Sequence, residues 1–396
     1  MFRQTMAVLA VLVAAALPIA APAAPAQPPI FGAYYPGGSA ERYPVSSIPA
    51  ERLTHLFYAF STIEDGRCAI GAEASANFVA LAELKRRHPH LRTLISIGGW
   101  GAGGFSDAAL TEASRRRLVD SCMALFFERH AGSFDGVDID WEFPVSGGPK
   151  ELAHRPQDRA NLTKLAQAFR VALDARGRKA GQPMLLTAAL AAGRLQTDGP
   201  YDPAASYDLP ALAKVFDFIN LMSYDMGTGF SSVSTFNAPL HEVPADPLAP
   251  ELRRWNNVAG AVQYYRERGV PASKLVLGVP FYGRGFKVTG ESADGLYQAY
   301  SAPADAGDWR VIKARYLDQP GWDKYWQPQA QSPWLYNPAE KIFISYEDPR
   351  SIGLRAQFAR EQGLAGVFMW ELTGDDEQAS LLNAMLAPWQ KARVGD

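Results

Sequence analysis

Four acidic side chains, Asp135, Asp138, Asp140 and Glu142, lie close together in the segment FDGVDIDWEFP, residues 134–144, which otherwise reads as a buried strand. Alternate side chains of a strand point to opposite faces, so Asp138, Asp140 and Glu142 share one face and the apolar residues between them share the other. Burying an unpaired carboxylate costs several kcal/mol. Three carboxylates on one inward face therefore indicate a chemical role.

Three roles suit such a row of carboxylates. A satisfied ion network would need inward basic partners, and the other strand-like segments offer none. A divalent metal site would use the carboxylate oxygens as ligands, but no His or further Asp cluster marks the neighbouring strand ends, so we expect no metal. The third role is proton chemistry, because like charges a few Å apart cannot all ionise and one carboxyl then keeps a proton at a raised pKa. Glu142, at the carboxyl end of the segment, is the candidate general acid.

Eight β-rich runs alternate with helix-like segments and would position these residues. The pattern favours a (β/α)8 TIM barrel, whose active sites form at the carboxyl ends of the strands. A doubly wound open sheet is the rival fold, but no Gly-rich dinucleotide fingerprint follows the first run. The runs are IFGAYY (30–35), LTHLFYAF (53–60), RTLISIG (92–98), FDGVDIDW (134–141), MLLTAAL (184–190), FDFINLMSY (216–224), KLVLGVPF (274–281) and GLAGVFMW (363–370).

One segment between the runs, DRANLTKLAQAFRVALDARG at residues 158–177, shows the spacing of an amphipathic helix. Such helices would cover the outside of the barrel. We expect the following side chains to form its buried stripe: Leu162, Leu165, Phe169, Val171 and Leu173.

The gap between the seventh and eighth runs is about twice what one helix and its turns need. Residues 286–345 are therefore expected to form a small α+β insertion at the carboxyl rim of the barrel. Aromatic residues in this stretch either build a small core of their own or, for one or two of them, line a cleft wall. They are Trp309, Tyr316, Trp322, Tyr325, Trp326 and Trp334.

The overall charge argues against polyanionic partners. The chain has 39 Lys and Arg residues against 41 Asp and Glu, for a formal net charge of -2. It therefore offers no basic field for nucleic acid or an anionic membrane surface. A neutral or small partner is expected.

The amino-terminal residues indicate export. Residues 1–26 combine a basic start, an apolar run and small residues near a cleavage region, as in a secretory signal peptide; an uncleaved membrane anchor is the alternative, for which the run is short. Residues 27–396 are expected to form one secreted, monomeric catalytic domain, free of the membrane, in the periplasm or outside the cell. In an exported chain, Cys68 and Cys122 invite a disulfide, although nothing in the sequence shows that they lie close together.

The segment DGVDIDWEFP resembles the acidic strand motif of the family 18 glycoside hydrolases, the chitinases. Further motifs of that family match in order over nearly all of the chain after residue 27, which is far more specific than the acidic motif alone. The insertion before FISYEDPRSI is similar to the α+β module of one chitinase subgroup. The matching motifs are GAYYP, THLFYAF, SIGGW, LMSYDM, LGVPFYGRGF and GVFMWEL.

The resemblance implies roles for the acidic row. Glu142 would protonate the glycosidic oxygen while the N-acetyl carbonyl of the substrate attacks the anomeric carbon, the substrate-assisted route known for this family. Asp140 would hold the acetamido N–H, and Asp138 behind it would share a proton. Tyr224 would hydrogen-bond the acetamido carbonyl and orient it for attack. No metal or organic cofactor is implied.

The resemblance also implies a set of cleft residues, with Trp370 as the floor on which a sugar stacks. Ser96 is expected to hydrogen-bond Asp138, Gly98 to support the strand, and Asp135 to have a structural role. A Gly-rich loop, SIGGWGAGGFSD, and the lack of a tryptophan after GAYYPGG depart from the family and leave the preferred chain length open. The implied cleft residues are Tyr34, Phe60, Gly99, Trp100, Met222, Asp225, Tyr282, Arg284 and Trp370.

The sequence thus predicts a retaining endo-type chitinase that hydrolyses β-1,4-linked N-acetylglucosamine chains. An endo-β-N-acetylglucosaminidase acting on glycoprotein glycans would share the motif and the mechanism. A non-catalytic chitin-binding lectin is the alternative from another class, but such proteins typically lack the acid at the position of Glu142.

Overall fold

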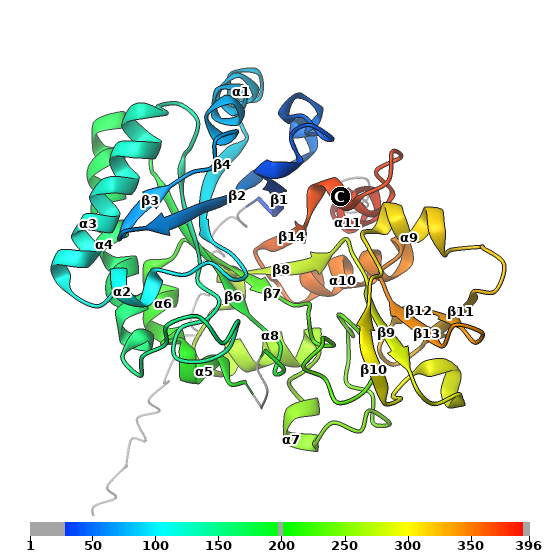
Figure 1. Ribbon diagram of the computed structural model, residues 1–396. Helices are drawn as coiled ribbons and strands as arrows, with labels where there is room; N and C mark the ends of the chain where they lie inside the picture. The colour runs from blue at the N-terminus through cyan, green and yellow to red at the C-terminus, as the bar shows by residue number, and fades with distance from the viewer. Residues whose placement is uncertain (1–27, 197–200, 391–396) are drawn as a thin grey trace, which may run out of the picture.

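The computed structural model describes residues 28–196 and 201–390 (Figure 1). The signal peptide expected at residues 1–26 lies outside the described residues. Within the two described ranges, no helix is both long and apolar enough to cross a membrane.

Eight parallel strands form a closed barrel (Figure 1). Their order around the barrel is β1-β14-β8-β7-β6-β5-β4-β2, and β1 pairs in turn with β2. The predicted (β/α)8 fold is confirmed, and each predicted run overlaps one strand. The strands are β1 (Ile30–Pro36), β2 (His55–Glu64), β4 (Arg92–Gly98), β5 (Gly136–Asp140), β6 (Leu185–Ala191), β7 (Phe218–Met222), β8 (Leu275–Pro280) and β14 (Gly366–Trp370).

Helices follow the strands and cover the outside of the barrel. Two begin at capping boxes: Thr111 accepts the Ser114 N–H at the start of α3, and Asp348 accepts the Ser351 N–H before Pro349 opens α10. The longer helices are α1 (Ala74–Arg87), α3 (Glu112–Cys122), α4 (Asp158–Ala180), α8 (Val258–Glu267), α10 (Pro349–Glu361) and α11 (Ser380–Gln390). The shorter ones are α2 (Phe105–Ala108), α5 (Pro203–Ser206), α6 (Leu209–Val215), α7 (Pro250–Arg253) and α9 (Trp309–Arg315).

Helix α4 confirms the predicted amphipathic segment with one exception. Leu162, Leu165, Phe169 and Leu173 are buried, as expected. Val171 is 70% exposed, so its predicted place in the buried stripe was wrong. Two residues beyond Phe169 is more than half a helical turn, which points Val171 away from the barrel.

The stretch between β8 and β14 contains a second, antiparallel sheet of five strands, seen in yellow and orange beside the barrel in Figure 1. Its order is β10-β9-β13-β12-β11, and it begins at Arg284, two residues before the predicted insertion. Trp334 stacks on Tyr325 with ring centroids 5.0 Å apart inside its small core. The strands are β9 (Arg284–Val288), β10 (Tyr300–Ala304), β11 (Asp323–Gln327), β12 (Ser332–Asn337) and β13 (Ile342–Ser345).

A disulfide joins Cys68 to Cys122, with their Cα atoms 5.1 Å apart. Cys68 lies on β3 (Arg67–Ala69), which pairs antiparallel with the end of β2, and Cys122 ends α3. The bond therefore ties the β2–β3 hairpin to the helix layer. The sequence left open whether the two cysteines are bridged, because only this tertiary contact brings them together.

Candidate active site

The acidic row, Asp138, Asp140 and Glu142, runs along β5 from the barrel interior to the carboxyl end of the strand. Asp138 is 0% exposed and Asp140 is 3% exposed, while Glu142 lies just beyond the strand and is partly exposed. Strand β4 lies alongside, with Ser96 opposite Asp138 and Gly98 opposite Asp140. The three carboxyl groups thus share the inward face that the period-two pattern predicts.

Asp138 is held by four side-chain donors from four different strands. Its Oδ2 accepts hydrogen bonds from the Tyr34 hydroxyl (2.8 Å) and from Ser96 Oγ (2.7 Å). Its Oδ1 accepts from Thr187 Oγ1 (2.6 Å) and Asn220 Nδ2 (3.5 Å). Burial raises the pKa of Asp138, and the four donors oppose that shift. The predicted Ser96 contact is present.

Asp140 and Glu142 are coupled carboxyl groups. Burial, followed by the negative charges of Glu142 and Asp138, raises the pKa of Asp140 well above its usual range. Burial, followed by the charge of Asp225, raises the pKa of Glu142 to about 8, while a hydrogen bond with Asp140 opposes the shift. At neutral pH the pair therefore retains a proton that the two carboxyl groups share. The Oδ1 atom of Asp140 is buried and has no hydrogen-bond partner in the structure.

Two glycines let the backbone approach this pair. Gly98 has φ of +118°, and a Cβ there would lie 1.9 Å from the Asp140 carbonyl oxygen. The Gly99 N–H donates to that same oxygen at 2.9 Å. A Cβ on Gly99 would lie 2.6 Å from the Phe60 ring. Gly99 therefore makes room for Phe60, and it is Phe60 that lines the cleft.

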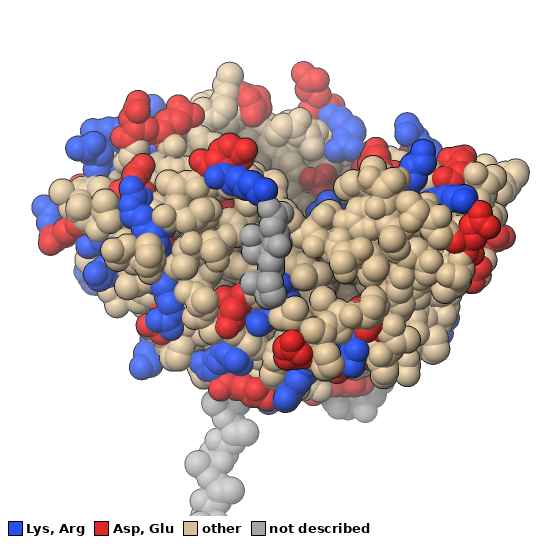
Figure 2. All heavy atoms as spheres, turned by 60° about the horizontal axis from the view of Figure 1, so that its bottom comes forward, with Lys and Arg blue, Asp and Glu red and all other residues tan. Residues whose placement is uncertain are grey.

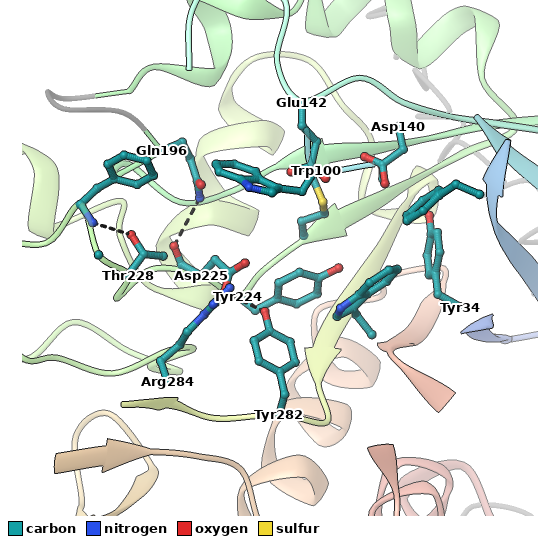
Figure 3. A pocket seen from close by; sticks show the side chains of 16 residues that line it. Tyr34, Trp100, Asp140, Glu142, Gln196, Tyr224, Asp225, Thr228, Tyr282 and Arg284 are labelled. Carbon is teal, nitrogen blue, oxygen red and sulfur yellow. Dashed lines mark hydrogen bonds and ion pairs between the residues drawn. The ribbon is translucent and has the colours of Figure 1, made fainter. Parts of the chain in front are cut away.

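A cavity of about 620 Å³ opens above the acidic row (Figure 3). Its volume is in the range of small-molecule ligand sites. Except for Gly99, every cleft residue implied by the resemblance lines this cavity. Its lining comprises Tyr34, Phe60, Trp100, Asp140, Glu142, Ala189, Gln196, Met222, Tyr224, Asp225, Thr228, Gly229, Phe230, Tyr282, Arg284 and Trp370.

Aromatic rings form two groups on the cavity wall. Trp370 lies nearly parallel to Phe60, at 5.6 Å between centroids and 21° between planes, and Tyr34 packs against it at 5.6 Å. Trp100 is 54% exposed at the rim, and its ring lies 6.4 Å from that of Phe230. The cavity therefore offers a flat, partly buried surface at one place and an exposed indole at another.

Tyr224 projects into the cavity from the end of β7. Figure 3 shows its hydroxyl pointing into the space below Glu142. Burial raises the pKa of Tyr224 well above its usual range, so the phenol stays neutral and can donate a hydrogen bond. Met222, two residues earlier on the same face, also lines the cavity, as the sequence parity predicts.

Asp225 anchors a polar wall of the cavity. Its Oδ1 accepts hydrogen bonds from the Tyr282 hydroxyl (2.7 Å) and from Arg284 Nε (2.8 Å) and Nη2 (2.6 Å). Tyr282 follows β8, and Arg284 begins β9 of the inserted sheet. The inserted sheet thus contributes a charged side chain to the cavity.

Two sets of residues named in the sequence analysis lie outside the cavity lining. Asp135 lies at the amino end of β5, where it pairs with Lys85 (2.9 Å) and accepts the Thr93 N–H (2.8 Å), so it supports the barrel and not the cleft. Among the described cavity-lining residues, none of the six aromatic residues predicted as cleft-wall candidates is present. These are Trp309, Tyr316, Trp322, Tyr325, Trp326 and Trp334.

Sequence reasoning missed several residues. Thr187 is the one polar side chain in the run MLLTAAL, a signal that could have marked it as a partner of the acidic row. Asn220 shares parity with Met222 and could have been found in the same way. Gln196, Thr228 and Phe230 lie in loops, where no periodicity marks them.

Comparisons with known proteins agree with this geometry. Residues 31–375 match the family model of the glycosyl hydrolases family 18. Chitinase A1 of Niallia circulans is 40% identical over 311 residues, which cover 76% of this chain and 43% of that protein, so the chain spans less than half of that relative's length.

Solved structures give the same result. Chitinase ChiA74 from Bacillus thuringiensis superposes with a TM-score of 0.82 at 30% identity, covering 91% of this chain and 70% of that one. A family 18 N-acetylglucosaminidase from Paenibacillus barengoltzii superposes with a TM-score of 0.80 at 32% identity, covering 91% and 100%.

Proposed function

Because this chain belongs to family 18 of the glycosyl hydrolases, we propose that it is an endochitinase that hydrolyses β-1,4-linked N-acetylglucosamine chains in the cavity above β5. The observation that carries this proposal is the place of the Glu142 carboxyl, which lines the cavity just beyond the carboxyl end of β5 next to Asp140. Its raised pKa of about 8 suits a general acid at neutral pH. Relatives named as chitinases support the substrate.

In the first step, Glu142 donates its proton to the glycosidic oxygen as the bond to the anomeric carbon breaks. The carbonyl oxygen of the substrate's own acetamido group bonds to that carbon and gives a cyclic oxazolinium-type intermediate. Asp225, the other acidic residue of the described cavity lining beside Asp140 and Glu142, is engaged by Tyr282 and Arg284. It is therefore not free to act as a nucleophile, which favours the substrate-assisted route.

Two side chains orient the acetamido group. The unpartnered Oδ1 of Asp140 can accept its N–H, and the neutral Tyr224 hydroxyl can donate to its carbonyl oxygen. Both contacts hold the attacking oxygen under the anomeric carbon and reduce the entropy that must be lost to reach the transition state.

In the second step, water attacks the anomeric carbon from the face that the leaving group vacated. The ionised Glu142 takes the proton of that water, and the acetamido group is restored. Two inversions give a product with the β-configuration of the substrate. The four donors around Asp138 favour its charged form against the effect of burial, and that charge would lie below Asp140 while the positive intermediate exists.

The aromatic groups fit the sugar-binding part of the proposal. Trp370 is the proposed platform for the sugar on the non-reducing side of the cleaved bond, since its nearly parallel packing on Phe60 fixes the ring plane. Trp100 and Phe230, at the other aromatic group, would contact the leaving sugars.

An enzyme that releases single N-acetylglucosamine units is a second candidate, because the Paenibacillus barengoltzii N-acetylglucosaminidase is similar over its full length. Product sizes from N-acetylglucosamine hexamer separate the two. Endo-cleavage yields dimer, trimer and tetramer early in the reaction, whereas monomer together with pentamer as the first products would contradict the endochitinase proposal.

The remaining expectations form part of this proposal. Export directed by residues 1–26 is supported by the Cys68–Cys122 disulfide, since such bonds persist in oxidising compartments. The face in Figure 2 carries interspersed positive and negative side chains, which agrees with a neutral polysaccharide substrate and not a nucleic acid. Residues 27–396 would act as a monomeric catalytic domain without a cofactor.

A further inference from the structure

Asn237 is a buried amide in the long loop that follows β7, and it is 0% exposed. All of its polar groups are hydrogen-bonded. Its backbone N–H donates to Ser345 Oγ (2.9 Å), and its backbone oxygen accepts the Met226 N–H (2.9 Å). Its side-chain Oδ1 accepts the Asp225 N–H (2.9 Å), and its Nδ2 donates to the Tyr282 carbonyl oxygen (3.3 Å).

These side-chain bonds reach the backbones of two residues that also bond each other. The Tyr282 hydroxyl donates to Asp225 Oδ1 at 2.7 Å, so the three residues form a closed ring of hydrogen bonds. Asp225 has φ of +54°, in the left-handed region that non-glycine residues seldom adopt. The Asn237 amide therefore holds an unfavourable backbone conformation at the point where the Asp225 carboxylate enters the cavity.

We propose that Asn237 is a positioning residue of the active site, whose side-chain amide fixes the Asp225 carboxylate in the cavity wall by holding the backbones of Asp225 and Tyr282. Only an amide of this length fits both contacts, because one atom must accept an N–H and the other must donate to a carbonyl. A carboxylate has no donor for Tyr282, and a serine hydroxyl is too short to span both. The inference rests on the proposed function insofar as this wall serves hydrolysis.

The position of Asp225 has a measurable consequence at Glu142. The negative charge of Asp225 contributes to the raised pKa of Glu142. If Asn237 is replaced and Asp225 leaves its place, the pKa of Glu142 should fall. The titratable and charged groups that act on or beside Glu142 are Asp140 at the end of β5, Tyr201 before α5, Tyr224 and Asp225 after β7, and Arg284 on β9.

The test reads the Glu142 carboxyl directly in the full chain labelled with ¹³Cδ-glutamate, with its resonance assigned by its loss in Glu142→Gln. Asn237→Ala and the milder Asn237→Ser are compared with Asp225→Asn. Asn257→Ala is the control, because Asn257 is an equally buried amide whose Oδ1 caps α8 at the Gly260 N–H (2.8 Å). Asn257→Ala should lower the stability of the fold through the lost helix cap, as the Asn237 variants should through their lost hydrogen bonds, but it leaves the contacts of Asp225 in place.

We expect both Asn237 variants to lower the pKa of Glu142 by at least about half a unit, and Asn257→Ala to leave it unchanged. The double variant Asn237→Ala/Asp225→Asn should shift the pKa no further than Asp225→Asn alone, since both changes act through one carboxylate. A Glu142 pKa that stays at the wild-type value in the Asn237 variants overturns the inference, as do fully additive shifts. If Asn237→Ala does not fold, the pKa of Glu142 in Asn237→Ser decides between the same two outcomes.

Activity separates this inference from the proposed function. The titration needs no substrate, so a wild-type protein that fails to cleave chitooligosaccharides contradicts the proposed function and leaves the titration result standing. In a wild-type protein that does cleave them, the alkaline limb of kcat/KM should move to lower pH in both Asn237 variants and stay in place in Asn257→Ala. A lower rate with an unmoved limb would reveal a purely structural role and contradict the inference.

Discussion

The Tyr34 hydroxyl donates a hydrogen bond to Asp138 Oδ2 at 2.8 Å and so joins the first barrel strand to the base of the acidic row. Asn220 Nδ2 donates to the same tyrosine oxygen at 3.0 Å. Tyr34 also packs against Trp370. Tyr34 therefore connects Asp138, at the base of the acidic row, to Trp370, the proposed sugar platform.

Removing that hydroxyl should weaken catalysis and shift its pH dependence. Tyr34→Phe takes one donor from Asp138, so the pKa of Asp138 should rise and the acidic limb of kcat/KM should move to higher pH. A lost hydrogen bond to a charged group is worth about 1.5–3 kcal/mol, or about a tenfold to hundredfold loss of kcat. Tyr35→Phe, whose hydroxyl bonds the Tyr43 carbonyl instead, should leave the acidic limb in place; equal shifts in both variants would contradict the role of Tyr34.

The raised pKa of Glu142 also makes stability depend on pH. Its folded pKa of about 8 lies above the ordinary value of 4.5, so its contribution to stability is complete below pH 4.5 and is lost as the pH rises through 8. Glu142→Gln does not titrate, so its melting temperature relative to wild type should increase from pH 4 to pH 9. Thermal unfolding of the exposed Glu128→Gln serves as the control, and a pH-independent difference for Glu142→Gln would refute the assignment.

The aromatic platform should dominate substrate binding. Trp370→Ala should lower kcat/KM on N-acetylglucosamine hexamer by about tenfold to hundredfold, since it removes a large stacking surface. Trp326→Ala is the matched control, because Trp326 lies on β11 of the inserted sheet, where its ring faces Arg350 of α10, and it is outside the cavity lining. Equal losses in the two variants would show that the inserted aromatic residues bind substrate after all.

The disulfide should matter for stability and not for chemistry. Replacing Cys68 and Cys122 by Ser opens a loop that spans 54 residues, which should lower the free energy of unfolding by about 2–4 kcal/mol. Activity at 25 °C should remain within about twofold of wild type, since neither cysteine lines the cavity. Reduction of the wild type should reproduce the loss of stability, and a reduced protein that melts like the oxidised one would contradict this role.

The barrel and the acidic row could be predicted because both follow from local periodicity. The period of two in DGVDIDWE places Asp138, Asp140 and Glu142 on one face whatever the rest of the chain does. Val171 shows the limit of the same argument on a helix, since an apolar residue in an amphipathic segment need not belong to the buried stripe.

The parts that could not be predicted depend on contacts between distant segments. Phe230 and Gln196 come from loops whose course is set by tertiary packing, and Asn237 has no neighbour in sequence that marks its bonds to Asp225 and Tyr282. Whether Cys68 and Cys122 are bridged could not be decided from the sequence for the same reason. Aromatic content alone could not decide between the two alternatives for the inserted sheet, which builds a small core around Trp334 and contributes Arg284 to the cavity lining.

The most direct test of the central claim is time-resolved ¹H NMR of the products that the mature wild type and Glu142→Gln release from N-acetylglucosamine hexamer. We predict that the wild type releases β-anomeric oligomers first and that Glu142→Gln is slower by about 100- to 10,000-fold, the usual contribution of a general acid. Initial release of α-anomers, or a Glu142→Gln rate within about tenfold of wild type, would contradict the substrate-assisted mechanism with Glu142 as its proton donor.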